Sequence, residues 1–336
     1  MTMRTRIKTF GILAATFLLT LNVGLLMAGN AHAQNLPTLV LTTGAEGGGY
    51  HKWSTQSAAM CEDVVRVQVL PSTGGPENLN RLESNDANMA LMQMDTLLLN
   101  AAARQISGIK VLTPMFPEQL HFIARVGLAK TSGGVAGIGA TKTPVDFVTQ
   151  LGGMSVAAAG GAQDTAQYIS NTLKFTVVRD PGTSKDVVAK VLKGQYDVGL
   201  LTGVFPIDWL KGMAPADKNQ LKFLSVPKEG VAGLNAYRPG SLSYSGFAGL
   251  GTTATPTFQV SSVLMVQDYK KGVKAEAVAR YRECLYERSE DMASETGSHP
   301  AWRFIKPNST VDNWPMWEAP AGQVQPAAPA KPAVKK

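Results

Sequence analysis

The sequence predicts an α/β protein built from two blocks, each with a mostly parallel sheet flanked by helices. Short apolar runs typical of buried strands alternate with longer segments of helical periodicity along most of the chain. Glycine-rich loops follow several of these strands and lead into helices. About 285 residues separate the two atypical ends of the 336-residue chain, which is enough for two lobes of ordinary domain size.

The first block combines four predicted strands with three predicted helices. Its strands are expected at Leu39–Leu41, Val67–Leu70, Met89–Met94 and Leu120–Val126. Its helices are expected at His51–Val65, Pro76–Asn85 and Asp95–Arg104. Pro76 suits a first helical position, because the amide hydrogen that proline lacks has no partner there.

The second block repeats the same rhythm. Its strands are expected at Met154–Ala158, Phe175–Val178, Asp197–Leu201 and Leu221–Val226. Helices are expected at Val145–Leu151, from the following glycine loop to Leu173, and after an N-cap at Ser184. The stretch from Lys228 to Thr257 has no clear pattern. A further strand is expected at Phe258–Val266 and a long helix at Ala275–Glu295.

Both ends of the chain differ from this pattern. Residues 1–33 are expected to be a secretory signal peptide, with three early basic residues, an uncharged apolar run and Ala31-His32-Ala33 as cleavage site. An uncleaved membrane anchor is the alternative. Residues 320–336 are rich in Ala and Pro, lack aromatic residues and are expected to be disordered. The mature protein is therefore expected in the periplasm.

The net charge of +7 overstates how basic the protein is. Without the signal peptide, 29 basic residues remain against 25 acidic ones, and three of those 29 are lysines of the tail. The remaining core is close to neutral, so no nucleic-acid partner is expected.

Cys61 and Cys284 are a possible disulfide, since an even pair in an oxidising compartment favours one. Two separate buried thiols are the alternative.

Four glycine loops stand out as a possible binding site: Thr43–Tyr50, Ser72–Asn78, Gly160–Thr165 and Thr202–Pro206. A strand that ends in glycines and opens into a helix leaves backbone N–H groups without partners, and these attract anions. In parallel sheets the carboxyl ends of strands form the ligand site. Two such loops in each block predict one cleft that holds a small anion.

These loops resemble those of TAXI-type solute receptors, the extracytoplasmic binding proteins of one TRAP transporter group. Thr43–Tyr50 is similar to that family's opening loop, Ser72–Leu79 to its second loop, and Met92–Asp95 to its V-Q-S-D segment. The resemblance implies a two-lobed type II periplasmic-binding-protein fold with two crossing strands. We expect residues 36–126 plus 256–319 in lobe 1 and residues 127–255 in lobe 2.

Three departures from the family pattern affect the ligand. Glu46 places an acid in the first loop, where it would point outward or meet an ammonium group. His51 replaces a second tyrosine, and Ala162-Gln163-Asp164 replaces small hydroxyl residues. Arg125 and Arg179 are candidate clamps for a carboxylate, with ordinary ion pairs as the alternative.

The expected ligand-binding residues come from these loops and the adjoining strand end. They are Thr43, Gly44, Glu46, Gly48, Gly49, Tyr50, Thr73, Gly74, Gly75, Gln93, Gly160, Gly161, Gln163, Asp164, Thr165 and Gly203.

The expected function is a periplasmic receptor that captures a small carboxylate or amino-acid-like anion. The resemblance implies delivery to a TRAP-type membrane permease. The alternatives are a sensory receptor for a signalling partner and a binding protein of a tricarboxylate- or phosphonate-type transporter. We expect a monomer without cofactor or metal, and no enzyme, because the mature chain has three dispersed histidines and no P-loop, G-x-S-x-G or C-x-x-C motif.

Overall fold

The computed structural model describes residues 37–133, 140–227, 229–234, 236–247 and 254–320. The predicted signal peptide, and residues 321–336 of the predicted tail, lie outside these ranges. The chain divides into Met1–Pro37 and Thr38–Lys336, and the fold described below is that of the second unit.

A ten-stranded sheet forms the centre of this unit, with the order β2-β1-β3-β12-β4-β9-β7-β8 along its main path. These strands are β1 Thr38–Thr42, β2 Arg66–Leu70, β3 Met89–Gln93, β4 Ile109–Arg125, β7 Ser155–Ala159, β8 Thr176–Asp180, β9 Val198–Gly203 and β12 Thr255–Gln267. Two further strands pair off this path: β10 (Leu221–Phe223) with β4 and β11 (Arg238–Leu242) with β12. A separate hairpin consists of β5 (Ala129–Ser132) and β6 (Thr141–Pro144).

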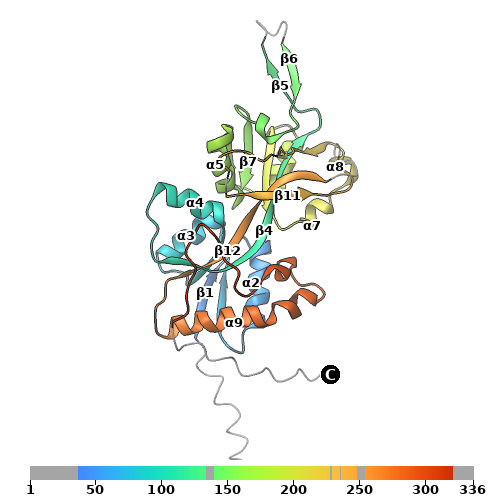
Figure 1. The fold of residues 1–336 in the computed structure, drawn as a ribbon. Helices are drawn as coiled ribbons and strands as arrows, with labels where there is room; N and C mark the ends of the chain where they lie inside the picture. Colours follow the sequence, from blue (N-terminus) through green and yellow to red (C-terminus); the bar gives the residue numbers. More distant parts are fainter. Residues whose placement is uncertain (1–36, 134–139, 228, 235, 248–253, 321–336) are drawn as a thin grey trace, which may run out of the picture. The chain divides into compact units, whose positions relative to one another are not determined.

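The sheet contains two parallel regions, one from each predicted block. β1 pairs in parallel with β2 and β3, and β7 pairs in parallel with β8 and β9. Between them, the long strands β4 and β12 pair antiparallel with each other and link the two regions (Figure 1). The predicted fold class, with two mostly parallel regions and two crossing strands, is confirmed. The lobe boundaries stay a prediction, because the continuous strands β4 and β12 run between the two regions.

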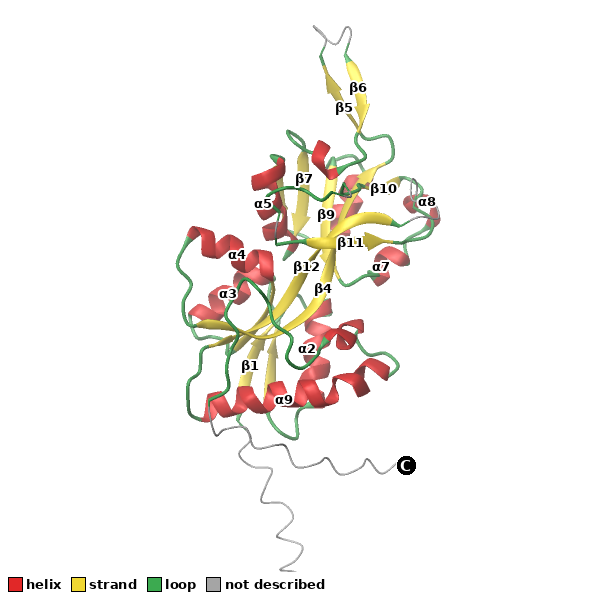
Figure 2. Cartoon of the chain, viewed as in Figure 1, coloured by secondary structure: helices red, strands yellow, loops and turns green. Residues whose placement is uncertain are grey.

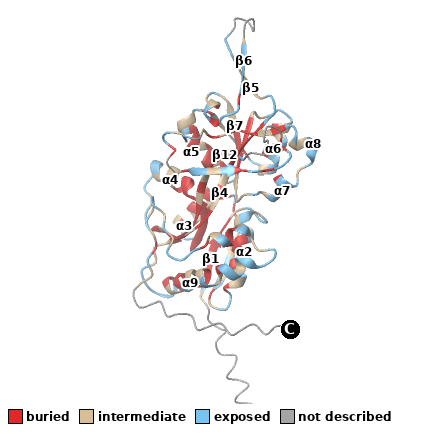
Figure 3. Cartoon of the chain, turned by 45° about the vertical axis from the view of Figure 1, so that its right-hand side comes forward, coloured by how far each residue is buried: buried red, intermediate tan, exposed pale blue. Residues whose placement is uncertain are grey.

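Helices cover both parallel regions (Figure 2). Their bounds are α2 Gly49–Met60, α3 Gly75–Glu83, α4 Met94–Ala103, α5 Ala162–Leu173, α6 Ser184–Leu192, α7 Asp208–Lys211, α8 Pro215–Lys218 and α9 Val273–Ser294, with 3-10 turns η1 Val148–Gln150 and η2 Pro300–Phe304. Figure 3 shows that the central strands are mostly buried. Among the described residues, no helix is long and apolar enough to cross a membrane.

The sequence reading was wrong about several elements. The helix expected at Val145–Leu151 is only the 3-10 turn η1. The N-cap of α6 is Thr183, not Ser184, because the Thr183 hydroxyl accepts the Asp186 N–H while the Asp186 carboxylate accepts the Thr183 N–H. The hairpin β5–β6 and the strand β11 were not predicted.

The largest difference concerns β4, which is 17 residues long where the sequence predicted only its last part. Pro114 and Pro117 lie inside it, and proline lowers the expectation of a strand because it donates no ladder hydrogen bond. The structure accommodates both: they pair with Val263 and Ser261 of β12, and a register shift separates the two pairs.

Cys61 and Cys284 form a disulfide that joins the end of α2 to the middle of α9. Both residues are buried in an apolar cluster with Trp53, Tyr281 and Trp302. The bond closes a loop with a sequence separation of 223 residues, so it restricts the unfolded chain strongly.

Replacing both cysteines with alanine is expected to lower the free energy of unfolding by about 2–5 kcal/mol. Urea unfolding of the double variant and of the oxidised protein would measure the difference. The oxidised protein should also show no free thiol after denaturation without reductant. Two reactive thiols, or an unchanged urea midpoint, would contradict this prediction.

Candidate functional site

The glycine loops of the two blocks meet at the carboxyl ends of their strands. Gly74, which follows β2, lies so close to the loop after β7 that a Cβ atom on it would be 2.9 Å from the Gly161 nitrogen. A Cβ atom on Gly160 would be 3.5 Å from the Thr73 carbonyl oxygen. Gly74 also has a φ of 125°, which L-residues rarely adopt. Glycine at position 74 therefore permits a direct backbone contact between the blocks.

The Gln93 side chain makes a second connection between the two blocks. Gln93 ends β3 and is the N-cap residue of α4. Its amide nitrogen donates to Oε2 of Glu118 at 3.0 Å, and its amide oxygen accepts from the Thr165 hydroxyl of α5 at 3.4 Å. Because Gln93 is only 3% exposed, these polar atoms depend on protein partners for their hydrogen bonds.

Glu118 is a buried carboxylate in the middle of the crossing strand β4. It is 5% exposed, and its Oε1 accepts a 2.5 Å hydrogen bond from the Tyr50 hydroxyl of α2. Burial raises the pKa of Glu118 from 4.5 to about 7. The neighbouring charge of Asp95 raises this pKa further, whereas the hydrogen bonds from Tyr50 and Gln93 lower it. Burial, followed by the charge of Glu118, also raises the pKa of Tyr50 well above its ordinary value.

Two more buried carboxylates adjoin Glu118 in series: Asp95 interacts with Glu118, and Asp164 interacts with Asp95. Asp95, in the first turn of α4, is fully buried and accepts from the Tyr237 hydroxyl at 2.7 Å and from the Thr96 N–H at 2.8 Å. Asp164, in the first turn of α5, is 4% exposed. Burial raises the pKa of both groups, and the charge of Asp164 adds to the effect on Asp95. We call Asp95, Glu118 and Asp164 the carboxylate cluster.

The first glycine loop contributes the N-terminus of α2. A Cβ atom on Gly49, the first residue of α2, would lie 3.4 Å from Nε2 of His299. Nδ1 of His299 accepts from the Ala301 N–H at 3.2 Å, so the ring proton belongs on Nε2. Burial, with a smaller effect from Lys52, lowers the pKa of His299 to about 4. The ring is therefore neutral at pH 7 and its Nε2–H faces the start of α2.

The other residues predicted in the first loop lie in different surroundings. Thr43 is buried, and its single hydroxyl proton is shared between the Gly44 and Leu70 carbonyl oxygens, at 3.3 and 3.4 Å. Gly48 is half-buried, and its N–H donates to the Ala45 carbonyl. Glu46 is exposed, and no hydrogen bond or ion pair among the described residues connects it to the carboxylate cluster.

Several remaining predicted residues have local partners. The Thr73 hydroxyl and N–H both donate to Glu77, and a Cβ atom on Gly75 would be 2.9 Å from Cγ2 of Thr96. The Gln163 amide donates to the Asp180 carbonyl at 2.9 Å. Gly203 ends β9 opposite Gln119, the residue after Glu118.

The two arginines proposed as clamps lie in different places. Arg179 is half-exposed, and its guanidinium is 3.6 Å from Asp164. Arg125 is exposed at the end of β4, beside Gly194. Arg179 is thus the one that borders the loops, although its ion pair is long.

Sequence reasoning missed the buried polar residues that lie among these loops. Glu118 follows a proline in a stretch that was not recognised as a strand, Tyr237 lies in the unassigned segment, and His299 was noted only as a dispersed histidine. Asp95 ends the Met92–Asp95 segment that resembles the V-Q-S-D segment of TAXI receptors, and this resemblance was the only sequence signal for any of these buried residues. The burial of these residues depends on segments that are distant in sequence.

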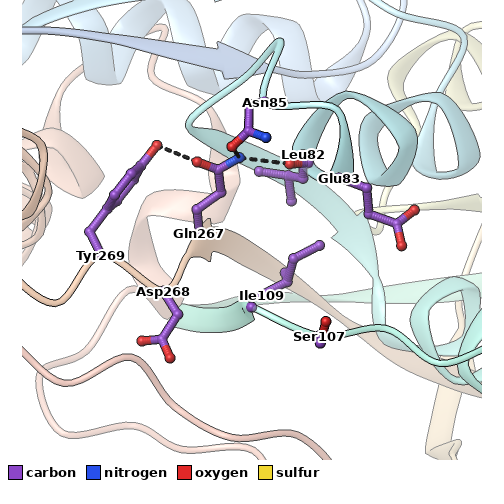
Figure 4. A pocket seen from close by; sticks show the side chains of 9 residues that line it. Leu82, Glu83, Asn85, Ser107, Ile109, Gln267, Asp268 and Tyr269 are labelled. Atoms are coloured by element: carbon purple, nitrogen blue, oxygen red, sulfur yellow. Dashed lines mark hydrogen bonds between the residues drawn. The ribbon is translucent and has the colours of Figure 1, made fainter.

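Two cavities in the described part of the chain lie away from the glycine loops. The larger, of about 350 Å³, is lined by residues from the end of α3, the start of β4 and the end of β12 (Figure 4). Gln267 and Tyr269 in its wall hydrogen-bond to each other and to neighbouring residues.

Within the described ranges, no group of three or more His, Cys, Asp or Glu side chains is placed to hold a metal ion.

Comparisons with known proteins find likenesses in structure but not in sequence. No protein-family model and no curated protein matches the chain. Among solved structures, the chain is similar to XAC2383 from Xanthomonas citri bound to chloride (15% identity, 80% of this chain and 88% of that chain, TM-score 0.45). It is also similar to the glutamate-bound GluR0 ligand-binding core from Nostoc punctiforme (12%, 80% and 96%, TM-score 0.47). A third similar structure is the L-cystine solute receptor of Neisseria gonorrhoeae (14%, 80% and 97%, TM-score 0.40). All three scores lie below 0.5, so the proposals below depend on the chain's own geometry.

The raised pKa of Glu118 predicts a pH-dependent stability. Because its folded pKa of about 7 exceeds the ordinary 4.5, its favourable contribution is fully present below pH 4.5 and is lost as the pH rises through 7. Glu118→Gln removes this titration. Relative to the unmodified protein, the variant should gain up to roughly 3 kcal/mol between pH 5 and pH 8.5, from ~1.4 kcal/mol per pKa unit.

Urea unfolding at several pH values would measure this difference. Glu290→Gln is the matched control, because the Glu290 side chain is 83% exposed and its salt bridge to Lys306 lies on the surface. The control should give no comparable pH-dependent difference. A difference between Glu118→Gln and the unmodified protein that stays constant with pH would show that the prediction is wrong.

Proposed function

We propose that this chain is a periplasmic solute-binding receptor that captures a small carboxylate or amino-acid-like anion. The observation that supports this most strongly is the meeting of glycine loops from both blocks at the carboxyl ends of their strands. Gly74 contacts Gly161, and Gln93 binds both Glu118 and Thr165. A solute held among these loops would contact both blocks at once, which is what a receptor that closes around its ligand requires.

Opening and closing would take place at the crossing strands. β4 and β12 link the two parallel regions, and their register shifts near Pro114 and Pro117. Bulges and prolines weaken a strand ladder locally, so we propose that these positions bend when the loops separate. A solute that binds both blocks would favour the closed arrangement, because only that arrangement offers all of its contacts.

The best place for a carboxylate group is the start of α2. Helices α3, α4 and α5 each have an acid of their own in the first turn: Glu77, Asp95 and Asp164. Helix α2 has no acidic residue in its first turn, so no carboxylate of that turn balances the positive end of its dipole. The Nε2–H of His299 faces the same point. Together they would bind a carboxylate through backbone and imidazole donors.

Delivery to a TRAP-type permease remains part of the proposal. It is supported by the resemblance of Thr43–Tyr50 and Ser72–Leu79 to TAXI receptor loops and by the predicted signal peptide. We propose binding without catalysis.

A thermal-shift screen of dicarboxylates, 2-oxoacids and amino acids would test the receptor function. A ligand present at 100 times its Kd should stabilise the folded protein by about 2.7 kcal/mol, seen as a higher Tm. Isothermal titration calorimetry of the best compound should then give one site per chain. No stabilisation by any of these compounds would contradict the proposal.

Gly74→Ala would test whether contact between the loops is needed for binding. Its Cβ atom would collide with the backbone of Gly161, so the loops would be held apart and affinity should fall at least tenfold. Gly108→Ala is the matched control, since Gly108 also has a positive φ but nothing within 4 Å of a Cβ atom. Gly74→Ala should also lose more stability than Gly108→Ala, because its Cβ atom adds a backbone collision to the strain of a positive φ. Equal affinities in the two variants would rule out the loop contact as a determinant of binding.

A further inference from the structure

The carboxylate cluster contains three buried acids and has one neighbouring cation, Arg179, among the described residues. Among the described residues, neither Glu118 nor Asp95 has a Lys, Arg or His partner within 4 Å, and Asp164 has only the half-exposed Arg179 at 3.6 Å. Hydroxyl, amide and backbone donors are the recorded partners of Glu118 and Asp95. Burying an ionised carboxylate without a cation is costly, so the site favours a positively charged partner.

Glu118 differs from the other two members of this cluster. Asp95 and Asp164 lie in the first turns of α4 and α5, where helix dipoles stabilise negative charge. Glu118 lies on strand β4, so its charge is not stabilised by a helix of its own segment. An ionised carboxylate can accept about four hydrogen bonds, and the structure records two for Glu118, from Tyr50 and Gln93. Its oxygens therefore retain capacity for further donors.

A second observation at the same loops concerns Thr96. Its hydroxyl is fully buried, and no hydrogen-bond partner for it exists in the described part of the chain. It lies in the first turn of α4, 3.0 Å from where a Cβ atom on Gly75 would be, beside the contact of Gly74 with Gly161. Buried hydroxyls normally have partners, so this one is available to a polar group of a bound solute.

We infer that the solute carries a protonated amine and that Glu118 accepts hydrogen bonds from it. This inference rests on the proposed receptor function and narrows its ligand to amine-bearing acids. Tyr50 connects the two proposed ends of the binding site. It is the second residue of α2, whose N-terminus suits the carboxylate of the solute. Its hydroxyl donates to Glu118, which would accept from the ammonium group. The ammonium group supplies the cation that Glu118 and Asp95 lack, and its other N–H groups suit uncharged acceptors such as the Thr96 hydroxyl.

Matched pairs of compounds that differ only at the amine test this inference. We would titrate L-glutamate against 2-oxoglutarate, L-alanine against pyruvate, and L-leucine against 4-methyl-2-oxopentanoate by calorimetry and thermal shift. In at least one pair the amino acid should bind the unmodified protein at least tenfold more tightly than the oxo acid. Glu118→Gln should remove that preference, because a neutral amide no longer attracts the ammonium.

Two further variants make the result specific. Glu290→Gln, far out on the surface, should keep the preference for the amino acid. Glu46→Gln tests whether the exposed acid of the first loop, and not Glu118, meets the amine. Circular dichroism and the urea midpoint of each variant would establish that it is folded under the conditions of the titration.

The outcomes separate this inference from the receptor proposal. Tighter binding of an oxo acid, or a preference that Glu118→Gln retains, would overturn the inference and leave the receptor intact. Loss of the preference in Glu46→Gln alone would also overturn the role of Glu118. If no compound of any pair binds the unmodified protein, the inference fails, whereas the receptor proposal fails only if the broader thermal-shift screen also finds no ligand.

Discussion

The antiparallel pairing of β4 with β12 is the constraint on which the rest of the structure depends. These two strands are the central members of the sheet, and each pairs with strands of a different parallel region. Because they run through both regions, they set where the glycine loops of one block stand against those of the other. They also carry Glu118 into the space between the loops, in the middle of the longer strand.

Charge balance at the helix N-termini follows from this arrangement. Four helices of nine or more residues begin at or near the glycine loops, and three of them are balanced by an acid of the chain itself. Among these four helices, only α2 has no acid in its first turn, and Nε2 of His299 lies beside its first residue. The surplus of buried carboxylates next to it gives the region two electrostatic characters, which is the requirement for a zwitterionic solute.

The loops were predictable from sequence because their features are local. Glycine runs after apolar strands mark the chain reversals, and Gly74 does make a close approach that only glycine permits. The polar residues between the loops carry no local signature. Glu118 follows a proline, and its partners Tyr50 and Gln93 lie 68 and 25 positions away. Tyr237 reaches Asp95 over 142 positions from a segment without a recognisable pattern.

The sequence by itself determined the alternation of strands and helices, the glycine loops and the presence of two cysteines that suit a bond. These properties follow from residue type and spacing along a few turns of chain. Only the tertiary structure decided that β4 extends through two prolines, that Cys61 lies beside Cys284, and that three acids are buried together. Which side chains are buried, and which charges lie near each other, depends on which distant segments pair in the sheet. Strand pairing over long sequence separations decides this, and local sequence patterns do not reveal it.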